Sequence, residues 1–158
     1  NNMDLIIKEI IDKKEKEIIS KEVLYDLPEW FGLPESTKEY IKDSQDKSFL
    51  ACYADDEVAG FIVLNATSKD TADIFVMGIK KKFHRMGIGT KLNTEFENMA
   101  KNLGYSYSQV KTVKMGHYKE YDITNEFYIA MGYKELECFP TLWDEWNPCQ
   151  IYIKYLGE

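Results

Sequence analysis

The chain has 158 residues, 44% of them hydrophobic, and a formal net charge of −7 at pH 7. We expect one domain over residues 1–158, since this length and apolar content suit a single core. The negative charge disfavours a surface built for nucleic acid, which needs clustered Lys and Arg. No apolar run approaches the ~18 residues of a membrane span and no cleavable signal opens the chain, so we expect a cytoplasmic protein without a membrane partner.

The first half of the chain alternates charged helical segments with β-rich runs. In chain order, the expected elements are a strand at 3–10, a helix over 12–32 that breaks at Pro28, a second short helix at 34–45, a hairpin of strands at 48–54 and 58–66 joined by the acidic turn 55–57, and a strand at 72–79.

The second half opens on the most regular pattern in the chain. Apolar residues recur at helical spacing from Ile88 to Leu103, and Gly104 is placed to end that helix. After it we expect a strand at 105–113, a helix at 124–131 that ends at Gly132, and strands at 133–139 and 150–156. The order is mixed α and β, with one strand–helix–strand crossover.

The cysteines Cys52, Cys138 and Cys149 are widely spaced and form no C-x-x-C pair. Since the chain also has few histidines, we expect no metal site and interpret the cysteines as reduced thiols. Neither Cys138 nor Cys149 lies in a motif that supplies a partner base. A cysteine-nucleophile acyltransferase is therefore disfavoured.

Two glycines, Gly87 and Gly89, lie where the strand at 72–79 turns into the regular helix. Glycine permits a positive φ and lets another group approach the backbone closely. At a helix start, unpaired N–H groups converge where the helix dipole is positive, which suits an anion. A plain strand-to-helix turn is the alternative interpretation. We predict a phosphate-bearing ligand held by backbone amides together with His84, Arg85 and the lysines 80–82.

The residues after Gly89 argue against two common phosphate motifs. A Walker loop ends in Gly-Lys-Ser/Thr, but here Thr90 comes before Lys91. A dinucleotide fingerprint needs a small residue where Leu92 stands and an acidic residue on a later strand. A nucleotide-binding module is therefore disfavoured.

The segment 77–92, MGIKKKFHRMGIGTKL, resembles the acyl-coenzyme A signature of the GNAT acetyltransferase superfamily. In that family a strand runs into Q/R-x-x-G-x-G/A at a helix start, and the pattern falls here on 84–89, with His84 in place of Gln or Arg. A second family motif, F-Y-x-x-x-G-F/Y, matches FYIAMGY at 127–133. The two motifs occur in the family's order and on the expected elements.

The resemblance implies an α/β (α+β) fold of GNAT type. Its sheet is mixed and mostly antiparallel, of about six to seven strands, with helices on both faces and a splay between the two central strands. The implied cofactor is acetyl-CoA (coenzyme A). The resemblance also implies pantetheine contacts from the backbone of Met77 and Ile79 and room for the thioester at Gly78. The pyrophosphate would lie on His84, Arg85, Met86, Gly87, Ile88, Gly89 and Thr90.

The implied activity is N-acetyl transfer from acetyl-CoA to a primary amine of a small molecule or peptide by direct attack. Tyr128 occupies the position of the family's general acid. A phenol with its ordinary pKa of about 10 is protonated at neutral pH and can donate to a leaving thiolate. Core packing is the alternative, because only one of Phe127 and Tyr128 can face inward. A non-catalytic acyl-CoA-binding or sensor domain of the same fold is the competing function.

Asp73 is the first candidate for the base, because alternation places it on the strand face of Met77 and Ile79. Some family members carry Glu at this position. Asp is shorter, so a bridging water is one way to reach the amine, and a solvated carboxylate at a strand start is the alternative. His117 in the loop after 105–113 is a second candidate, with an ordinary pKa near neutrality.

Aromatic residues in two Pro-containing loop regions are candidates for acceptor binding, namely Trp30, Phe31 and Trp143. Trp in a loop suggests a pocket wall or a homodimer contact. Packing beneath the loops is the alternative. The acidic residues 55–57 and 144–146 either attract a cationic amine or increase solubility.

Overall fold

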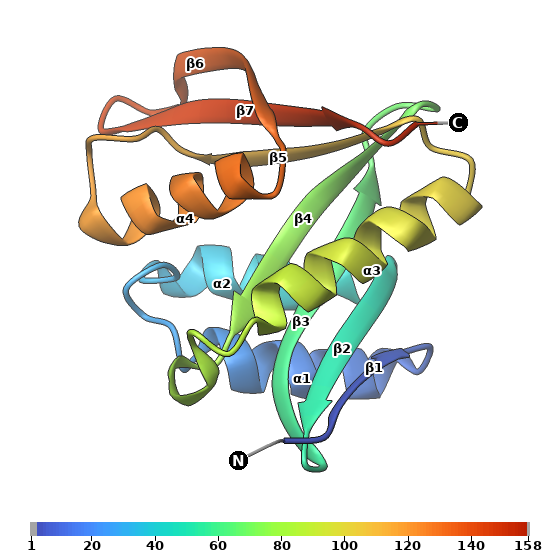
Figure 1. Cartoon of the computed structure of the whole chain (residues 1–158). Coiled ribbons are helices and arrows are strands. Elements are labelled where there is room, and N and C mark those ends of the chain that lie inside the picture. Colours follow the sequence, from blue (N-terminus) through green and yellow to red (C-terminus); the bar gives the residue numbers. More distant parts are fainter. Residues whose placement is uncertain (1–2, 158) are drawn as a thin grey trace. The chain divides into compact units, whose positions relative to one another are not determined.

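The computed structural model of the protein describes residues 3–157 (Figure 1). The elements in chain order are β1 (Leu5–Glu9), α1 (Lys13–Leu24), α2 (Pro34–Ser44), β2 (Ser48–Ala54), β3 (Glu57–Ala66), β4 (Thr71–Ile79), a 3₁₀ turn η1 (Lys81–Phe83), α3 (Ile88–Asn102), β5 (Tyr107–Val113), α4 (Lys119–Ala130), β6 (Lys134–Asp144) and β7 (Asn147–Tyr155). In residues 3–157 no helix is both long and apolar enough to cross a membrane.

The sheet has seven strands in the order β1-β2-β3-β4-β5-β7-β6. The pairs β1/β2, β2/β3, β5/β7 and β6/β7 are antiparallel, whereas β4 and β5 are parallel. The β4/β5 ladder joins Thr71–Ile74 to Tyr107–Val110. The mixed, mostly antiparallel sheet confirms the predicted fold class.

The contacts of the chain form two compact units. The first consists of the residues up to Asn65 together with Phe75–Met99, and the second of Ala66–Ile74 together with the residues from Ala100 onward. The predicted single domain over 1–158 stays a prediction.

In the first unit, both faces of the strands are buried. Side chains of α1 and α2 pack on one face in a cluster made of Ile10, Ile19, Val23, Leu24, Leu27, Ile41, Phe49, Ala51, Phe61, Val63 and Val76. In Figure 1, α3 covers the opposite face. Its residues Ile88, Leu92 and Phe96 are almost fully buried, as the helical spacing predicts.

In the second unit, α4 packs against β5 and β7 through a buried polar group. The Asn125 amide donates to the carbonyl oxygens of Val113 (2.8 Å) and Tyr121 (2.6 Å), and its oxygen accepts from the Tyr152 hydroxyl (2.6 Å). Tyr133 and Ser108 share a second buried hydrogen bond of 2.6 Å. Since buried polar groups need partners, these bonds fix how α4 lies on its strands.

The observed α4 begins at Lys119, five residues before the predicted helix start at 124. Its first turn is polar and carries Glu120 and Asp122, which a helix N-terminus favours. The apolar pattern is absent from that turn, so it gave no signal for the helix start.

The region predicted as a Pro-containing loop around Trp143 is also corrected, because β6 extends to Asp144. Pro140 is tolerated in β6 because this is the edge strand of the sheet, where one side needs no ladder hydrogen bonds. The Asp144 carboxylate then closes the turn by accepting from the N–H groups of Trp146 (2.8 Å) and Asn147 (2.9 Å). The three cysteines are free, as predicted.

The backbone of β4 packs closely against Gly60 of β3, and this packing yields a stability prediction. A Cβ there would lie 2.6 Å from the Gly78 oxygen and 3.0 Å from Cγ1 of Ile79. We expect Gly60→Ala to lower the free energy of unfolding by about 1–3 kcal/mol, measured by urea denaturation, because backbone must move to admit the methyl group. Lys69→Ala at an exposed position is the control. Unchanged stability of Gly60→Ala would show that the two strands are not this close.

Candidate functional site

The turn from β4 into α3 leaves backbone N–H groups without helical partners. The bond from the Lys91 N–H to the Gly87 oxygen (3.1 Å) opens the hydrogen-bond pattern of α3. The N–H groups of Ile88, Gly89 and Thr90 precede it, so no residue of the helix can accept from them. Within residues 3–157 we find no other protein acceptor for them. Together with the helix dipole, these groups are suited to bind an anion.

Two positive φ angles shape this turn. Gly87 has φ 77° and Arg85 has φ 65°, and a non-glycine residue in that region costs roughly 1–2 kcal/mol. Backbone strain of this kind persists where the surrounding structure imposes it, and such places are often binding sites.

The predicted phosphate residues are mostly open to solvent. His84, Arg85, Met86, Gly87 and Thr90 are exposed, and Gly89 is half-buried. Ile88 differs from them. Its side chain is 1% exposed and belongs to the core, so only its N–H is available to a ligand.

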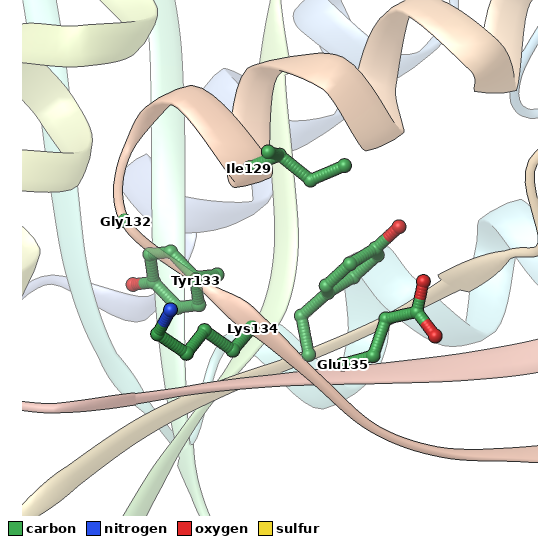
Figure 2. A pocket seen from close by; sticks show the side chains of 6 residues that line it. Ile129, Gly132, Tyr133, Lys134 and Glu135 are labelled. Carbon is green, nitrogen blue, oxygen red and sulfur yellow. The ribbon is translucent and has the colours of Figure 1, made fainter.

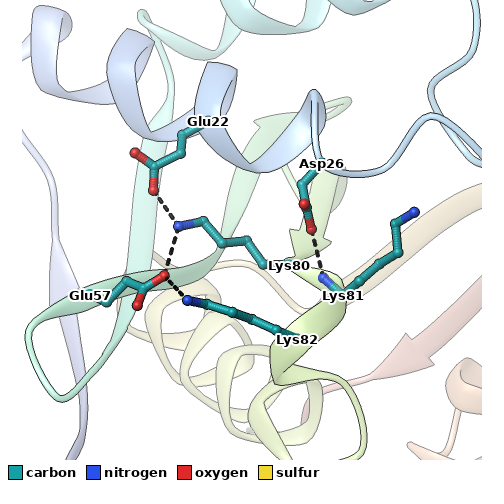
Figure 3. A network of polar contacts seen from close by, with 6 residues as sticks. All are labelled: Glu22, Asp26, Glu57, Lys80, Lys81 and Lys82. Carbon is teal, nitrogen blue, oxygen red and sulfur yellow. Dashed lines mark hydrogen bonds and ion pairs between the residues drawn. The ribbon is translucent and has the colours of Figure 1, made fainter.

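The lysines 80–82, predicted to lie beside a phosphate, are instead paired with carboxylates (Figure 3). Lys80 contacts Glu22 and Glu57, and Lys82 contacts Glu57 at 2.7 Å. Lys81 pairs with Glu29 at 2.7 Å. The hydrogen bond from Lys82 lowers the pKa of the Glu57 carboxyl, and the one from Lys81 lowers that of Glu29. All three ammonium groups therefore have anionic partners already.

His84 is held by the end of β4. Its Nε2 lies 2.7 Å from the Ile79 oxygen, and its ring packs edge-on to Trp30 with centroids 6.0 Å apart. The Ile79 oxygen, predicted to contact pantetheine, is thus engaged by a protein atom. A Cβ on Gly78 would meet side chains of α1, with Val23 at 3.0 Å. Packing of α1 therefore explains this glycine, and the predicted room for the thioester has no support from its geometry.

In the second unit, the candidate base Asp73 is 4% exposed and lies among polar side chains of β5. Its Oδ1 accepts from Nε2 of Gln109 at 3.1 Å and lies 3.5 Å from Nζ of Lys111. Burial raises the pKa of this carboxyl, while Lys111 and Gln109 act in the opposite direction. The sequence did not point to Gln109 or Lys111, since the register of β4 with β5 is not visible in it.

Tyr128, the candidate acid, is 5% exposed, whereas its neighbour Phe127 is half-buried. Of the two, Tyr128 is therefore the one that faces inward. The centroid of its ring lies 5.2 Å from the ring centroid of Phe127 and 5.7 Å from that of Tyr133. Burial raises the pKa of its phenol well above the ordinary value, with smaller effects from Tyr133 and Asp73. His117, the second candidate base, is exposed.

The candidate acceptor-binding aromatic residues fall into different units. Trp30 and Phe31 are half-buried against the core of the first unit, where Phe31 packs edge-on to Tyr40 at 5.9 Å. This is the loop packing considered as the alternative. Trp143 is 44% exposed and belongs to the second unit. The role of these residues in binding an acceptor stays a prediction.

A cavity of about 350 Å³ lies in the second unit, beside the end of α4 (Figure 2). It is lined by Ile129, Gly132, Tyr133, Lys134, Glu135 and Tyr152. None of the predicted site residues lines it, and the hydroxyl of Tyr152 is engaged with Asn125.

Solved structures of similar fold cover nearly the whole chain. A GNAT-family protein from Desulfovibrio desulfuricans has 14% identity and a TM-score of 0.82 over 98% of this chain and 100% of its own. The aminoglycoside 6′-N-acetyltransferase from Enterococcus faecium has 18% identity and a TM-score of 0.77, covering 97% and 98%. A GNAT-family acetyltransferase from Elizabethkingia anophelis, solved with acetyl-CoA bound, has 16% identity and a TM-score of 0.71, covering 96% and 97%.

No curated protein matches the sequence significantly. The sequence profile of the acetyltransferase (GNAT) family does match it, over residues 16–133, which span the β4–α3 turn and Tyr128. Because this match covers most of the chain, the protein belongs to the GNAT acetyltransferase family.

Proposed function

We propose that the protein is an acetyl-CoA-dependent N-acetyltransferase that acts on a primary amine of a small molecule or peptide. The observation that carries this proposal is the set of unpaired N–H groups at the start of α3, on the residues that carry the family's phosphate motif. A family relative that binds acetyl-CoA supports the choice of donor.

The donor's diphosphate is proposed to accept hydrogen bonds from the N–H groups of Ile88, Gly89 and Thr90. Oxyanions form strong, short bonds to backbone N–H groups, and the helix dipole adds to the attraction. Arg85 is the exposed cation in the turn itself. The pantetheine arm is proposed to follow the backbone of β4 near Met77.

In the reaction, the amine nitrogen attacks the thioester carbonyl and forms a tetrahedral intermediate. The intermediate collapses with cleavage of the C–S bond, the nitrogen loses a proton, and the sulfur gains one. The products are the N-acetyl amine and free CoA. The protein has to hold the reactants together, accept the amine proton and stabilise charge on the sulfur.

Tyr128 is the candidate for stabilising the sulfur. Its raised pKa keeps the phenol protonated at neutral pH, so it is always a donor. A thiol has a pKa of about 8.5, which makes the phenol the weaker acid. We therefore propose that Tyr128 donates a hydrogen bond to the leaving thiolate, and that full proton transfer follows only as solvent re-enters.

Asp73 is the candidate base, and its environment permits that role. A pKa raised by burial brings a carboxylate closer to the range in which it accepts protons at neutral pH. Its side chain is short and already bonded to Gln109, so a bridging water is proposed to carry the amine proton. His117 or a chain of waters is the alternative acceptor.

The same engagement of Asp73 favours a second function, a non-catalytic acyl-CoA-binding or sensor domain. If Lys111 and Gln109 hold the carboxylate permanently, no base is available and the domain only binds its ligand.

Turnover separates the two functions. With acetyl-CoA and a panel of primary amines that includes aminoglycosides, polyamines and peptide N-termini, we expect release of free thiol that depends on the amine. The release is measured with a thiol-reactive dye. Tight CoA binding in calorimetry without thiol release from any amine would instead establish the binding domain.

Replacing Gly89 tests the phosphate site. In Gly89→Val, a branched side chain beside the α3 N–H groups should weaken CoA binding at least tenfold, about 1.4 kcal/mol, measured by calorimetry. Thr94→Val places the same side chain at an exposed position of α3 and should bind CoA normally. Equal CoA affinity of the two variants would contradict the site.

Replacing Tyr128 tests its role at the sulfur. Tyr128→Phe should lower kcat by about 10- to 100-fold, the worth of a hydrogen bond to a charged group, with little change in the KM for acetyl-CoA. Tyr133→Phe removes a buried hydroxyl bonded to Ser108 and is the matched control, expected to affect stability more than kcat. A normal kcat of Tyr128→Phe would show that the Tyr128 hydroxyl does not stabilise the leaving thiolate.

A further inference from the structure

A network of ion pairs and hydrogen bonds surrounds the segment that leads into the phosphate turn (Figure 3). It consists of Glu22, Asp26, Glu57, Lys80, Lys81 and Lys82, and we refer to it as the turn brace. The brace joins the end of β4 to α1 and to the start of β3.

Lys80 is the centre of the brace. Its side chain is only 11% exposed, and its ammonium donates to Glu22 and, at 3.4 Å, to Glu57. Its own N–H donates to the Ala59 oxygen at 2.8 Å. Lys80 is thus fixed through both its backbone and its side chain immediately after the end of β4.

The next two residues are held as well. The Lys81 N–H, at the start of η1, donates to the Asp26 carboxylate at 2.7 Å, which satisfies a donor that the short helix cannot pair. Lys82 completes the brace through Glu57 at 2.7 Å. Phe83 then inserts into the core with 4% exposure. The backbone is therefore fixed up to the residue before the His84–Thr90 segment.

We propose that the turn brace is a positioning device for donor binding, and that its lysines do not themselves contact phosphate. This inference rests on the proposed function. The brace holds the N–H groups of Ile88, Gly89 and Thr90 in their binding arrangement before the donor arrives, so binding does not have to order the turn. Glu22, Glu57 and Lys80 act through the turn and are positioning residues.

The burial of Lys80 favours this role over direct contact. An ammonium that is nearly buried needs its carboxylate partners, and moving it toward a phosphate would break its pairs with Glu22 and Glu57, of which Glu57 would keep only Lys82. The two roles also predict opposite effects of one substitution. If Lys80 contacted phosphate, Glu57→Gln would remove a competitor and tighten CoA binding. If the brace positions the turn, Glu57→Gln loosens it and weakens CoA binding.

The test uses two donors, acetyl-CoA and acetyl-pantetheine, which lacks the diphosphate. In Lys80→Met and Glu57→Gln we expect the Kd for CoA and the KM for acetyl-CoA to rise about three- to tenfold, as for loss of one or two hydrogen bonds. The kcat with acetyl-CoA and the kcat/KM with acetyl-pantetheine should stay unchanged. Lys14→Met, which breaks the exposed pair of Lys14 with Glu17, is the control. It should change neither the Kd for CoA nor the kinetics with either donor.

Three results would overturn the proposal. Tighter CoA binding by Glu57→Gln would show direct phosphate contact. An equal decrease of kcat/KM with acetyl-CoA and with acetyl-pantetheine would show that the substitutions damage the structure in general. Unchanged CoA binding in both variants, with a wild-type protein that binds CoA, would show that the turn needs no brace. Absence of CoA binding by the wild type would instead remove the proposed function, and the brace inference with it.

Discussion

The first turn of α3 carries N–H groups that the helix cannot satisfy, and its position is set by the core. Ile88, Leu92 and Phe96 are nearly fully buried, so the helix cannot slide or rotate to hide those groups. Gly87 and Arg85 take positive φ angles so that the chain can leave β4 and enter the helix over a few residues. Core packing therefore fixes at the protein surface a helix end whose N–H groups are suited to an anion.

The charge of the chain favours a donor site built from backbone groups, as proposed above. The chain carries a net charge of −7, which repels a donor that bears several phosphates. A cluster of lysines would counter this repulsion, but lysines 80–82 are paired with carboxylates of their own unit. Oriented N–H groups supply partial positive charge that no internal carboxylate neutralises. The proposed donor site thus relies on the local dipole rather than on the field of the whole protein.

Much of the fold could be predicted from local patterns. Two β-rich runs around an acidic turn predicted the strands at 48–54 and 58–66. Helical spacing predicted α3 from Ile88, because a helix that buries one face leaves a periodic pattern in the sequence. The turn brace has no such periodic pattern in the sequence. Lys80 and Glu22 are 58 residues apart, and Lys81 and Asp26 are 55 apart, so only the folded chain brings them together. The pairing of Asp73 with Gln109 could not be predicted from the sequence for the same reason.

The central claim is that the N–H groups of Ile88, Gly89 and Thr90 bind the diphosphate of the donor. An NMR titration of backbone amides tests it most directly, with CoA and with pantetheine as ligands. CoA should shift the signals of Gly87, Ile88, Gly89 and Thr90 strongly, whereas pantetheine should leave them nearly unmoved. If CoA binds while these four signals stay in place, the diphosphate lies elsewhere and the claim is wrong.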